Sequence, residues 1–211
     1  GGIMALVLVV AGTAAPWLAP HDPLRAVADS FGAPLPPQQG YWFGTDELGR
    51  DVLSRVLYGA RVSLLVGLCA TAIALTIGVT VGALAGFAGG WVDAFLMRIT
   101  DIMLAFPGLL LIVALSAVMQ PGLTTIFIAI GMVSWTTVAR TVRGELQGLR
   151  RRDFVAAAAA LGASPGRLVV RHLLPSVLPT IVIMAALGTS TTILLDAGMS
   201  YLGLGVPVPT P

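Results

Sequence analysis

The stretch from residue 102 to residue 139 contains no charged side chain. A helix needs about 20 mainly apolar residues to cross a bilayer, so this run is long enough for two crossings. The turn-forming sequence "QPG" at 120–122 divides it near its middle. The run therefore predicts two hairpinned transmembrane helices.

Further apolar runs occupy residues 1–20, 62–92 and 173–195, and each predicts one more crossing. The chain of 211 residues is 56% hydrophobic and only 10% charged, and its mean hydropathy is +0.92. These values lie outside the usual range of soluble globular domains. We therefore predict an all-α, polytopic membrane helix bundle with five visible spans, formed as a single transmembrane domain over residues 1–211.

The basic residues are distributed unevenly along the chain. All twelve are arginine, and seven of them fall within residues 140–172, namely Arg140, Arg143, Arg150, Arg151, Arg152, Arg167 and Arg171. The positive-inside rule therefore places this segment in the cytoplasm. Counting spans backwards makes residues 21–60 external and the N-terminus cytoplasmic, with short turns near 89–101 and 120–123.

Two classes of function have little support. A formal net charge of +2 gives no reason to expect nucleic-acid binding. His21 and His172 lie on opposite sides of the membrane in this topology, and Cys69 is the single cysteine. The sequence therefore predicts neither a metal site nor an internal disulfide.

Glycines recur at every fourth position in the second predicted span, at Gly78, Gly82, Gly86 and Gly90. This spacing places them along one helical stripe, where small residues let two helix backbones approach closely in lipid. The stripe predicts a helix-packing seam. The alternative is a seam that slides during gating.

The stretch "AAAAALGASPGRLVVRHLLP", residues 156–175, lies between two predicted spans. Residues 153–161 favour a helix, with Asp153 at the positive end of its dipole. Gly162 is placed to end that helix in a left-handed conformation, and Ser164 and Pro165 to begin another. Arg167 and Arg171 share one face of the second helix, and Pro175 and Pro179 precede the last span.

The surface of the first of these two helices is almost bare, because Ala156 to Ala160 present little but methyl groups. Contact with lipid headgroups and docking to another protein are both compatible with the pattern. An alanine face is, however, poorly suited to anchoring a helix in a membrane interface.

Two other polar features are candidate sites. The external sequence "GTDELGRD" and the residue Arg55 provide mixed charges that suit a folded cap or a contact with a partner, namely Asp46, Glu47, Arg50, Asp51 and Arg55. Asp51 and Arg55 are four apart and could pair on a helix. Asp196, near the end of the last span and within reach of external water, is a candidate for a pore or gate residue or for a helix terminus at the interface.

Several motifs, in order, resemble those of ABC importer permeases. In the cytoplasmic loop, Ala157, Ala158 and Gly162 match the family's Glu-Ala-Ala and glycine pattern, and Leu174-Pro175 its closing pair, although Ala156 replaces the glutamate. The stretches at 42–67, 89–111 and 200–211 are similar to the second permease subunit of dipeptide, oligopeptide and nickel importers.

The resemblance implies a type I ABC importer permease fold, with a sixth span missing beyond the last motif. It implies a non-catalytic, multi-pass subunit in a bacterial or archaeal inner membrane, paired with a related permease in a heterodimer. Two cytoplasmic ATPase subunits would bind ATP and Mg, so that this chain needs no cofactor. An external solute-binding protein would deliver di- or oligopeptides, with nickel complexes or glutathione-like molecules as alternative cargo.

The same resemblance implies that residues 140–178 form a cytoplasmic coupling loop that binds an ATPase subunit. The residues expected to couple are Asp153, Ala156, Ala157, Ala158, Leu161, Gly162, Arg167, Arg171 and Pro175. Functions of another class, a secondary transporter or channel and a membrane scaffold, remain alternatives.

Overall fold

The computed structural model describes residues 2–26, 34–119, 122–201 and 203. The helices in chain order are α1 (Gly2–Thr13), α2 (Ala15–Leu18), α3 (Val52–Ala88), α4 (Gly90–Ala105), α5 (Gly108–Val118), α6 (Leu123–Leu149), α7 (Asp153–Ala160), α8 (Pro165–Leu168), the π-helical turn η1 (Val169–Leu173) and α9 (Leu174–Tyr201). The ordered structure of these residues is helical, apart from two isolated β-bridges at 38–51. The predicted all-α class is confirmed.

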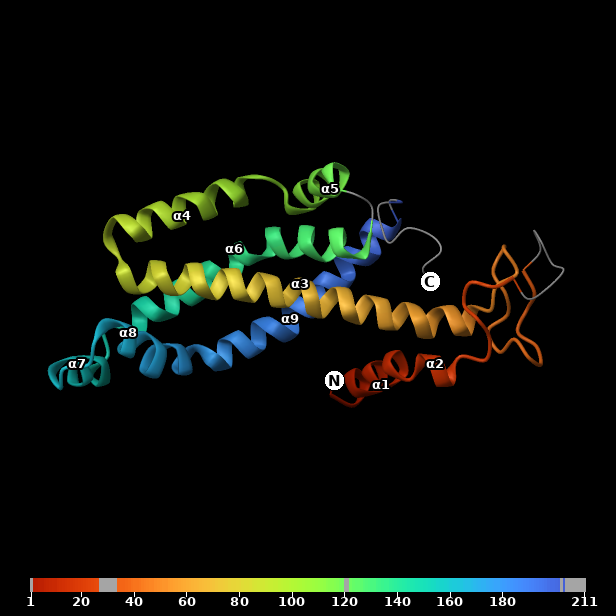
Figure 1. Cartoon of the computed structure of the whole chain (residues 1–211), viewed down its shortest axis with the longest axis horizontal. Coiled ribbons are helices and arrows are strands. Elements are labelled where there is room, and N and C mark those ends of the chain that lie inside the picture. The colour runs from red at the N-terminus through yellow and green to blue at the C-terminus, as the bar shows by residue number, and fades with distance from the viewer. Residues whose placement is uncertain (1, 27–33, 120–121, 202, 204–211) are drawn as a thin grey trace.

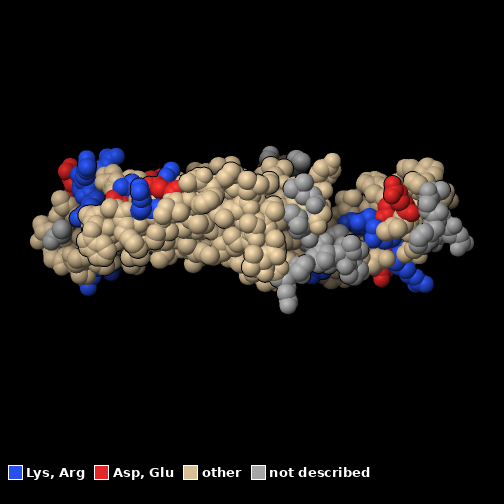
Figure 2. All heavy atoms as spheres, turned by 90° about the horizontal axis from the view of Figure 1, so that it is seen from above, with Lys and Arg blue, Asp and Glu red and all other residues tan. Residues whose placement is uncertain are grey.

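The molecule is elongated, and α3, α6 and α9 run along its length (Figure 1). The helices α7 and α8 lie at one end, and residues 34–51 lie at the other (Figure 1). Arginine and acidic side chains gather at the two ends, whereas the surface between them is uncharged on the face drawn in Figure 2. The two segments predicted to lie on opposite sides of a membrane therefore lie at opposite ends of the bundle.

Among the described residues, three helical stretches are long and apolar enough to cross a membrane, namely α3, α6 and the continuous stretch Pro165–Tyr201. The bent pair α4–α5 makes a fourth if it counts as one span. The expected span over residues 1–20 is instead the 12-residue α1 followed by the short α2. At a rise of about 1.5 Å per residue, α1 covers only about 18 Å. The helix breaks at Ala14, ahead of Pro16 in the first turn of α2.

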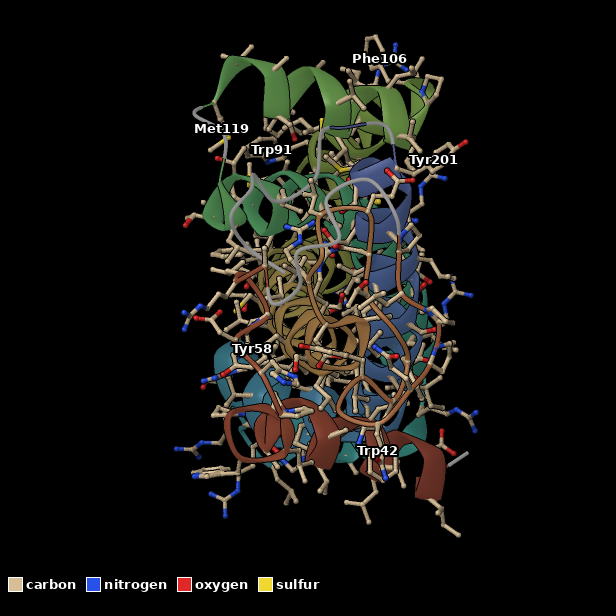
Figure 3. The ribbon with its side chains drawn as sticks, turned by 90° about the vertical axis from the view of Figure 1, so that its right-hand side faces the viewer. Trp42, Tyr58, Trp91, Phe106, Met119 and Tyr201 are labelled. Carbon is tan, nitrogen blue, oxygen red and sulfur yellow. The ribbon has the colours of Figure 1, made fainter. Side chains whose placement is uncertain are left out.

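The predicted turn near 89–101 is wrong, because α4 occupies these residues. Gly89 does end α3 as expected, with φ of +66°, but the chain re-enters a helix at once. The expected third span is then broken, since α4 and α5 are bent by 88° at Phe106-Pro107. Viewed along the long axis, α5 runs across the bundle between Phe106 and Met119 (Figure 3).

The contact between α3 and α6 uses three of the four striped glycines. A Cβ on Gly78 would lie 2.4 Å from Cβ of Val138, and one on Gly82 would lie 2.6 Å from the Ala139 carbonyl oxygen. A Cβ on Gly86 would lie 3.0 Å from the Arg143 carbonyl oxygen. The fourth glycine departs from the prediction: Gly90 lies beyond the end of α3, and a Cβ there would meet nothing within 4 Å.

We predict that Gly78→Ala destabilises the protein because the added methyl group must push α6 away from α3. Overpacking of this kind costs about 1–3 kcal/mol. The matched control is Gly59→Ala, also within α3, where an added Cβ meets nothing within 4 Å. Thermal unfolding of the detergent-purified protein measures both. A melting temperature for Gly78→Ala equal to that of Gly59→Ala would contradict the close-packed seam.

Candidate functional site

Residues 153–175, which the sequence resemblance predicts to couple to an ATPase and which we call the coupling segment, form a compact structure at one end of the molecule. The helix α6 leads into this end, and α9 leads away from it (Figure 1). The expected loop over residues 140–178 is almost entirely helical. The helix α6 continues to Leu149, so that Arg140 and Arg143 belong to it rather than to a loop. Pro175 and Pro179 lie within α9, which follows directly from η1. A displacement of the coupling segment must therefore act on two long helices.

The inner side of α7 packs against the bundle. Val155 is only 5% exposed and belongs to one apolar cluster with Leu146, Leu168 and Leu173. Ala158 packs against the same cluster. This burial fixes the position of α7 relative to α6 and α9.

The end of α7 is closed by a left-handed glycine. Gly162 has φ of +83°, as predicted, and the backbone N–H of Ala163 donates to the Ala158 carbonyl oxygen at 3.1 Å. This six-residue closure is the Schellman arrangement, which satisfies a helix carbonyl that would otherwise lack a partner. Ser164 stands at the start of α8 as expected, but its side chain makes no capping hydrogen bond.

The outer side of α7 is exposed and apolar. We call it the α7 outer surface, and it consists of Phe154, Ala156, Ala157, Ala160 and Leu161. Leu161 is 89% exposed, so its side chain projects from this surface. Asp153, Arg167, Arg171 and Pro175 are exposed in the same segment. Alanine side chains beside the exposed Phe154 and Leu161 make a surface that can enter a groove on another protein.

The structure shows a set of ion pairs that we did not predict from the sequence. Asp93 on α4 accepts two hydrogen bonds from the Arg143 guanidinium on α6, the second at 2.6 Å, and one from Gln147 at 3.2 Å. Arg140, also on α6, pairs with Asp101 on α4. These pairs attach α4 to the half of α6 that leads into the coupling segment. The sequence does not indicate the Asp93 pair, because its partner Arg143 is 50 residues away along the chain.

At the opposite end, residues 34–51, which the sequence predicts to be external and which we call the external cap, are organised around Asp46. Its carboxylate accepts hydrogen bonds from the backbone N–H groups of Leu48 and Arg50, each at 2.9 Å, and from the Arg50 and Arg55 guanidinium groups. Burial raises the pKa of Asp46, but these hydrogen bonds outweigh it and hold the pKa below its ordinary value. Glu47 is exposed. The cap is therefore a folded unit. A contact between its charges and a partner protein stays a prediction from the sequence.

The predicted pair between Asp51 and Arg55 does not form. Asp51 is fully buried and caps α3 instead, accepting from the Ser54 backbone at 3.1 Å and from the Ser54 hydroxyl at 2.6 Å. The Ser54 hydroxyl in turn accepts from the backbone N–H of His21, whose Nδ1 lies 3.6 Å from Asp51. This cap allows α3 to begin at Val52, ahead of the predicted span.

Asp196 lies inside the bundle rather than near water. It is 5% exposed, and its Oδ1 atom has no hydrogen-bond partner among the described residues. The expectation of access to external water is therefore not met in this structure. Across the described ranges no three His, Cys, Asp or Glu side chains gather into a possible metal site.

Comparison with known proteins shows relatives over nearly the whole chain. The chain is 39% identical over 209 residues to the oligopeptide transport system permease protein OppC of Bacillus subtilis, covering 68% of that protein. It is 38% identical to the dipeptide permease DppC of the same organism, covering 65% of it. It is 41% identical to the glutathione permease GsiD of Shigella flexneri, covering 69% of it. Each match covers 99% of this chain.

The fold has a counterpart among solved structures. An inward-facing structure of the MetNI methionine ABC transporter superposes with a TM-score of 0.61 at 23% identity, over 69% of this chain and 73% of that one. The helix bundle is thus that of an ABC importer permease. Residues 78–211 match the family model for the inner membrane component of binding-protein-dependent transport systems, and the chain belongs to that family. Membership decides against a secondary transporter, a channel or a scaffold.

We predict that Gly162→Ala loosens the end of α7, because a non-glycine residue in the left-handed conformation costs about 1–2 kcal/mol. Gly166→Ala is the matched control, since both sites are open and only Gly162 has a positive φ. Hydrogen exchange of the α7 amides measures the local opening. Equal protection in the two variants would contradict a structural need for glycine at 162.

We also predict that Arg143→Lys lowers the melting temperature more than Arg140→Lys. The Arg143 pair is less exposed, at 32% and 14% for its two side chains against 51% for both in the other pair. Lysine cannot reproduce the two-pronged contact with Asp93, and an exposed single pair contributes about 0–1 kcal/mol. Thermal unfolding of both variants checks this. A larger loss in Arg140→Lys would show that Asp101 is the main attachment of α4.

Proposed function

We propose that this chain is a permease subunit of an ATP-driven importer for di- and oligopeptides and forms half of its translocation pore. The relatives at about 40% identity are named for oligopeptides, a dipeptide system and glutathione, which is itself a short peptide. Glutathione-type cargo is therefore the closest alternative. A nickel complex remains a prediction from the sequence motifs.

The α7 outer surface is the observation that carries the coupling part of this proposal. It is exposed, nearly free of charge and held rigidly by Val155 and the Gly162 closure. We infer that it seats in a groove on a cytoplasmic ATPase subunit, with Arg167 and Arg171 beside it. Ala156 removes the carboxylate found in similar permeases, so seating here depends on shape and apolar contact.

The other partners follow from the same assignment. Two ATPase subunits bind ATP and Mg, a related permease completes the pore, and an external binding protein delivers cargo to the side of the external cap. In this arrangement the coupling segment lies in the cytoplasm, whereas a cytoplasmic N-terminus stays a prediction from the sequence. Closure of the ATPases would then move α7 and, through α6 and α9, rock the bundle between two discrete arrangements.

We predict that Leu161→Asp reduces copurification of the ATPase subunits by about tenfold or more, because it places an unpaired charge in a dry contact. Its side chain is 89% exposed, so the fold of this chain should not change. Leu48→Asp, at a 46% exposed leucine in the external cap, is the matched control. Copurification and ATP-dependent peptide uptake are measured together. Full ATPase binding by Leu161→Asp would refute docking through this surface.

A further inference from the structure

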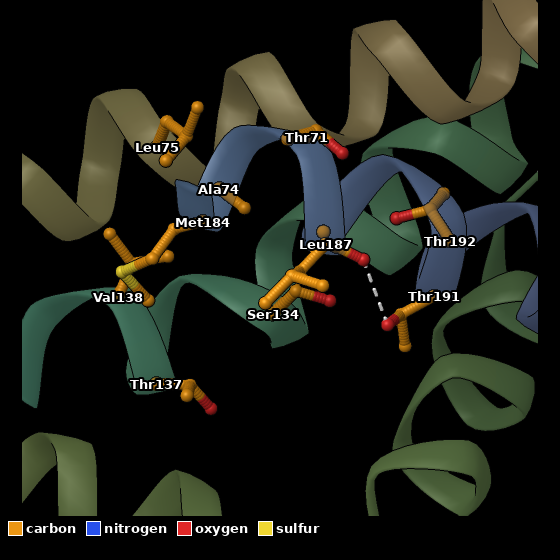
Figure 4. Close-up of a pocket in the computed structure, with 11 residues that line it drawn as sticks. Thr71, Ala74, Leu75, Ser134, Thr137, Val138, Met184, Leu187, Thr191 and Thr192 are labelled. Carbon is orange, nitrogen blue, oxygen red and sulfur yellow. Dashed lines mark hydrogen bonds between the residues drawn. The ribbon is translucent and has the colours of Figure 1, made fainter. Parts of the chain in front are cut away.

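A cavity of about 310 Å³ lies between α3, α6 and α9, in the uncharged middle of the bundle. Its walls carry a concentration of hydroxyl groups from all three helices: Thr71, Ser134, Thr137, Thr191 and Thr192 (Figure 4). The remaining lining residues are apolar or glycine, and none of the lining residues is charged. Membership in the transport family does not by itself assign a role to this cavity.

Three of these hydroxyl groups have no hydrogen-bond partner among the residues that the structure describes. The Thr191 hydroxyl donates to the Leu187 carbonyl oxygen at 3.0 Å. In contrast, the side chains of Ser134, Thr137 and Thr192 form no hydrogen bond with any residue that the structure describes. Thr192 is only 3% exposed. Ser134 is half-buried and Thr137 is exposed. A hydroxyl that opens onto the cavity without a protein partner is free to bind water or a polar guest.

Other threonines in the same helices show the alternative. Thr76 and Thr80 on α3 and Thr141 on α6 each donate to the carbonyl oxygen four residues earlier, at 2.7 to 3.0 Å. This is the usual way for a threonine to satisfy its hydroxyl within a transmembrane helix. The three unpaired hydroxyls at the cavity thus remain available to a polar guest.

We propose that this cavity is a transient binding site for peptide cargo, with the hydroxyls of Ser134, Thr137 and Thr192 binding backbone amide groups. The proposal rests on the proposed peptide import. A hydroxyl both donates and accepts, which matches the N–H and C=O of a peptide bond. Leu187 and Met184 provide apolar contact for side chains, and methionine adapts its shape readily. An uncharged lining suits cargo of varied sequence and charge.

The position of the cavity also suits cargo in transit. Two of its walls are α6 and α9, the helices that enter and leave the coupling segment, and the third is α3. The glycine seam holds α3 and α6 together. In contrast, only 11% of the most apolar 18 residues of Pro165–Tyr201, the stretch that contains α9, is buried, against 56% of the most apolar 18 residues of α6. Movement of α9 against the α3–α6 pair would therefore change the shape of the cavity in step with the coupling segment.

The test uses the complete transporter, with its partner permease and ATPases, in proteoliposomes supplied with the binding protein. The variant combines Ser134→Ala, Thr137→Val and Thr192→Val, which remove hydroxyls at little change in volume. We expect tri-alanine uptake to fall by about tenfold, the effect of losing several weak hydrogen bonds. Binding-protein-stimulated ATP hydrolysis should stay near the wild-type rate.

The matched control removes the same number of hydroxyls outside the cavity, through Thr76→Val, Thr80→Val and Thr141→Val. It should retain uptake. Wild-type uptake by the cavity variant, or an equal loss in the control, overturns the cavity as a peptide site. If the wild-type complex hydrolyses ATP but takes up no tri-alanine, both the peptide cargo and the peptide site are wrong. Loss in the cavity variant alone supports the site.

A labelling measurement keeps the proposal testable if the triple variant fails to fold. In a Cys69→Ala background, Thr137→Cys should react with a hydrophilic methanethiosulfonate reagent, and tri-alanine presented by the binding protein with ATP should slow the reaction. Thr76→Cys, outside the cavity, serves as the control. Thr137→Cys that is unreactive, or equally reactive with and without tri-alanine, overturns the proposal.

Discussion

Between α3 and α6 the two helix backbones lie directly against each other, because Gly78, Gly82 and Gly86 place no side chain between them. In a bilayer, lipid tails are as apolar as leucine, so hydrophobic burial gives little drive for two helices to associate. Close van der Waals contact between backbones supplies that drive instead. The seam extends from Gly78 to Gly86, opposite Val138 to Leu146 of α6.

The helix α6 connects this rigid pair to the surface proposed for ATPase binding. Its last turns carry Arg143, which holds α4, and it leads into α7, whose inner side is buried through Val155. The helix α9 leaves the same segment and is far less buried. A force applied at α7 would thus move a firmly held helix and a loosely held one unequally. The cavity between them is where that difference would change the space open to cargo.

Sequence patterns predicted the elements whose determinants are local. The end of α3 at Gly89 and the closure of α7 at Gly162 follow from glycines that adopt positive φ, and α7 begins at Asp153 as expected. The prediction failed at α4, because residues 89–101, which include the charged Asp93 and Asp101, fall between two uncharged runs and were expected to form a turn. Those charges are instead paired with arginines some 40 to 50 positions away in the chain. A pattern read along the chain contains no information about such partners.

The sequence by itself determined the membrane class, the helical composition and the helix break at Gly162, since hydropathy, glycine positions and helix-capping residues act over a few neighbouring residues. It also contained the motifs that indicate the transport family. Tertiary structure alone decided that Asp51 caps α3 rather than pairing with Arg55, that Asp196 is buried, and that hydroxyls from α3, α6 and α9 surround one cavity. These outcomes depend on which helix faces meet, and the close approach permitted by glycine at the α3–α6 seam sets that geometry.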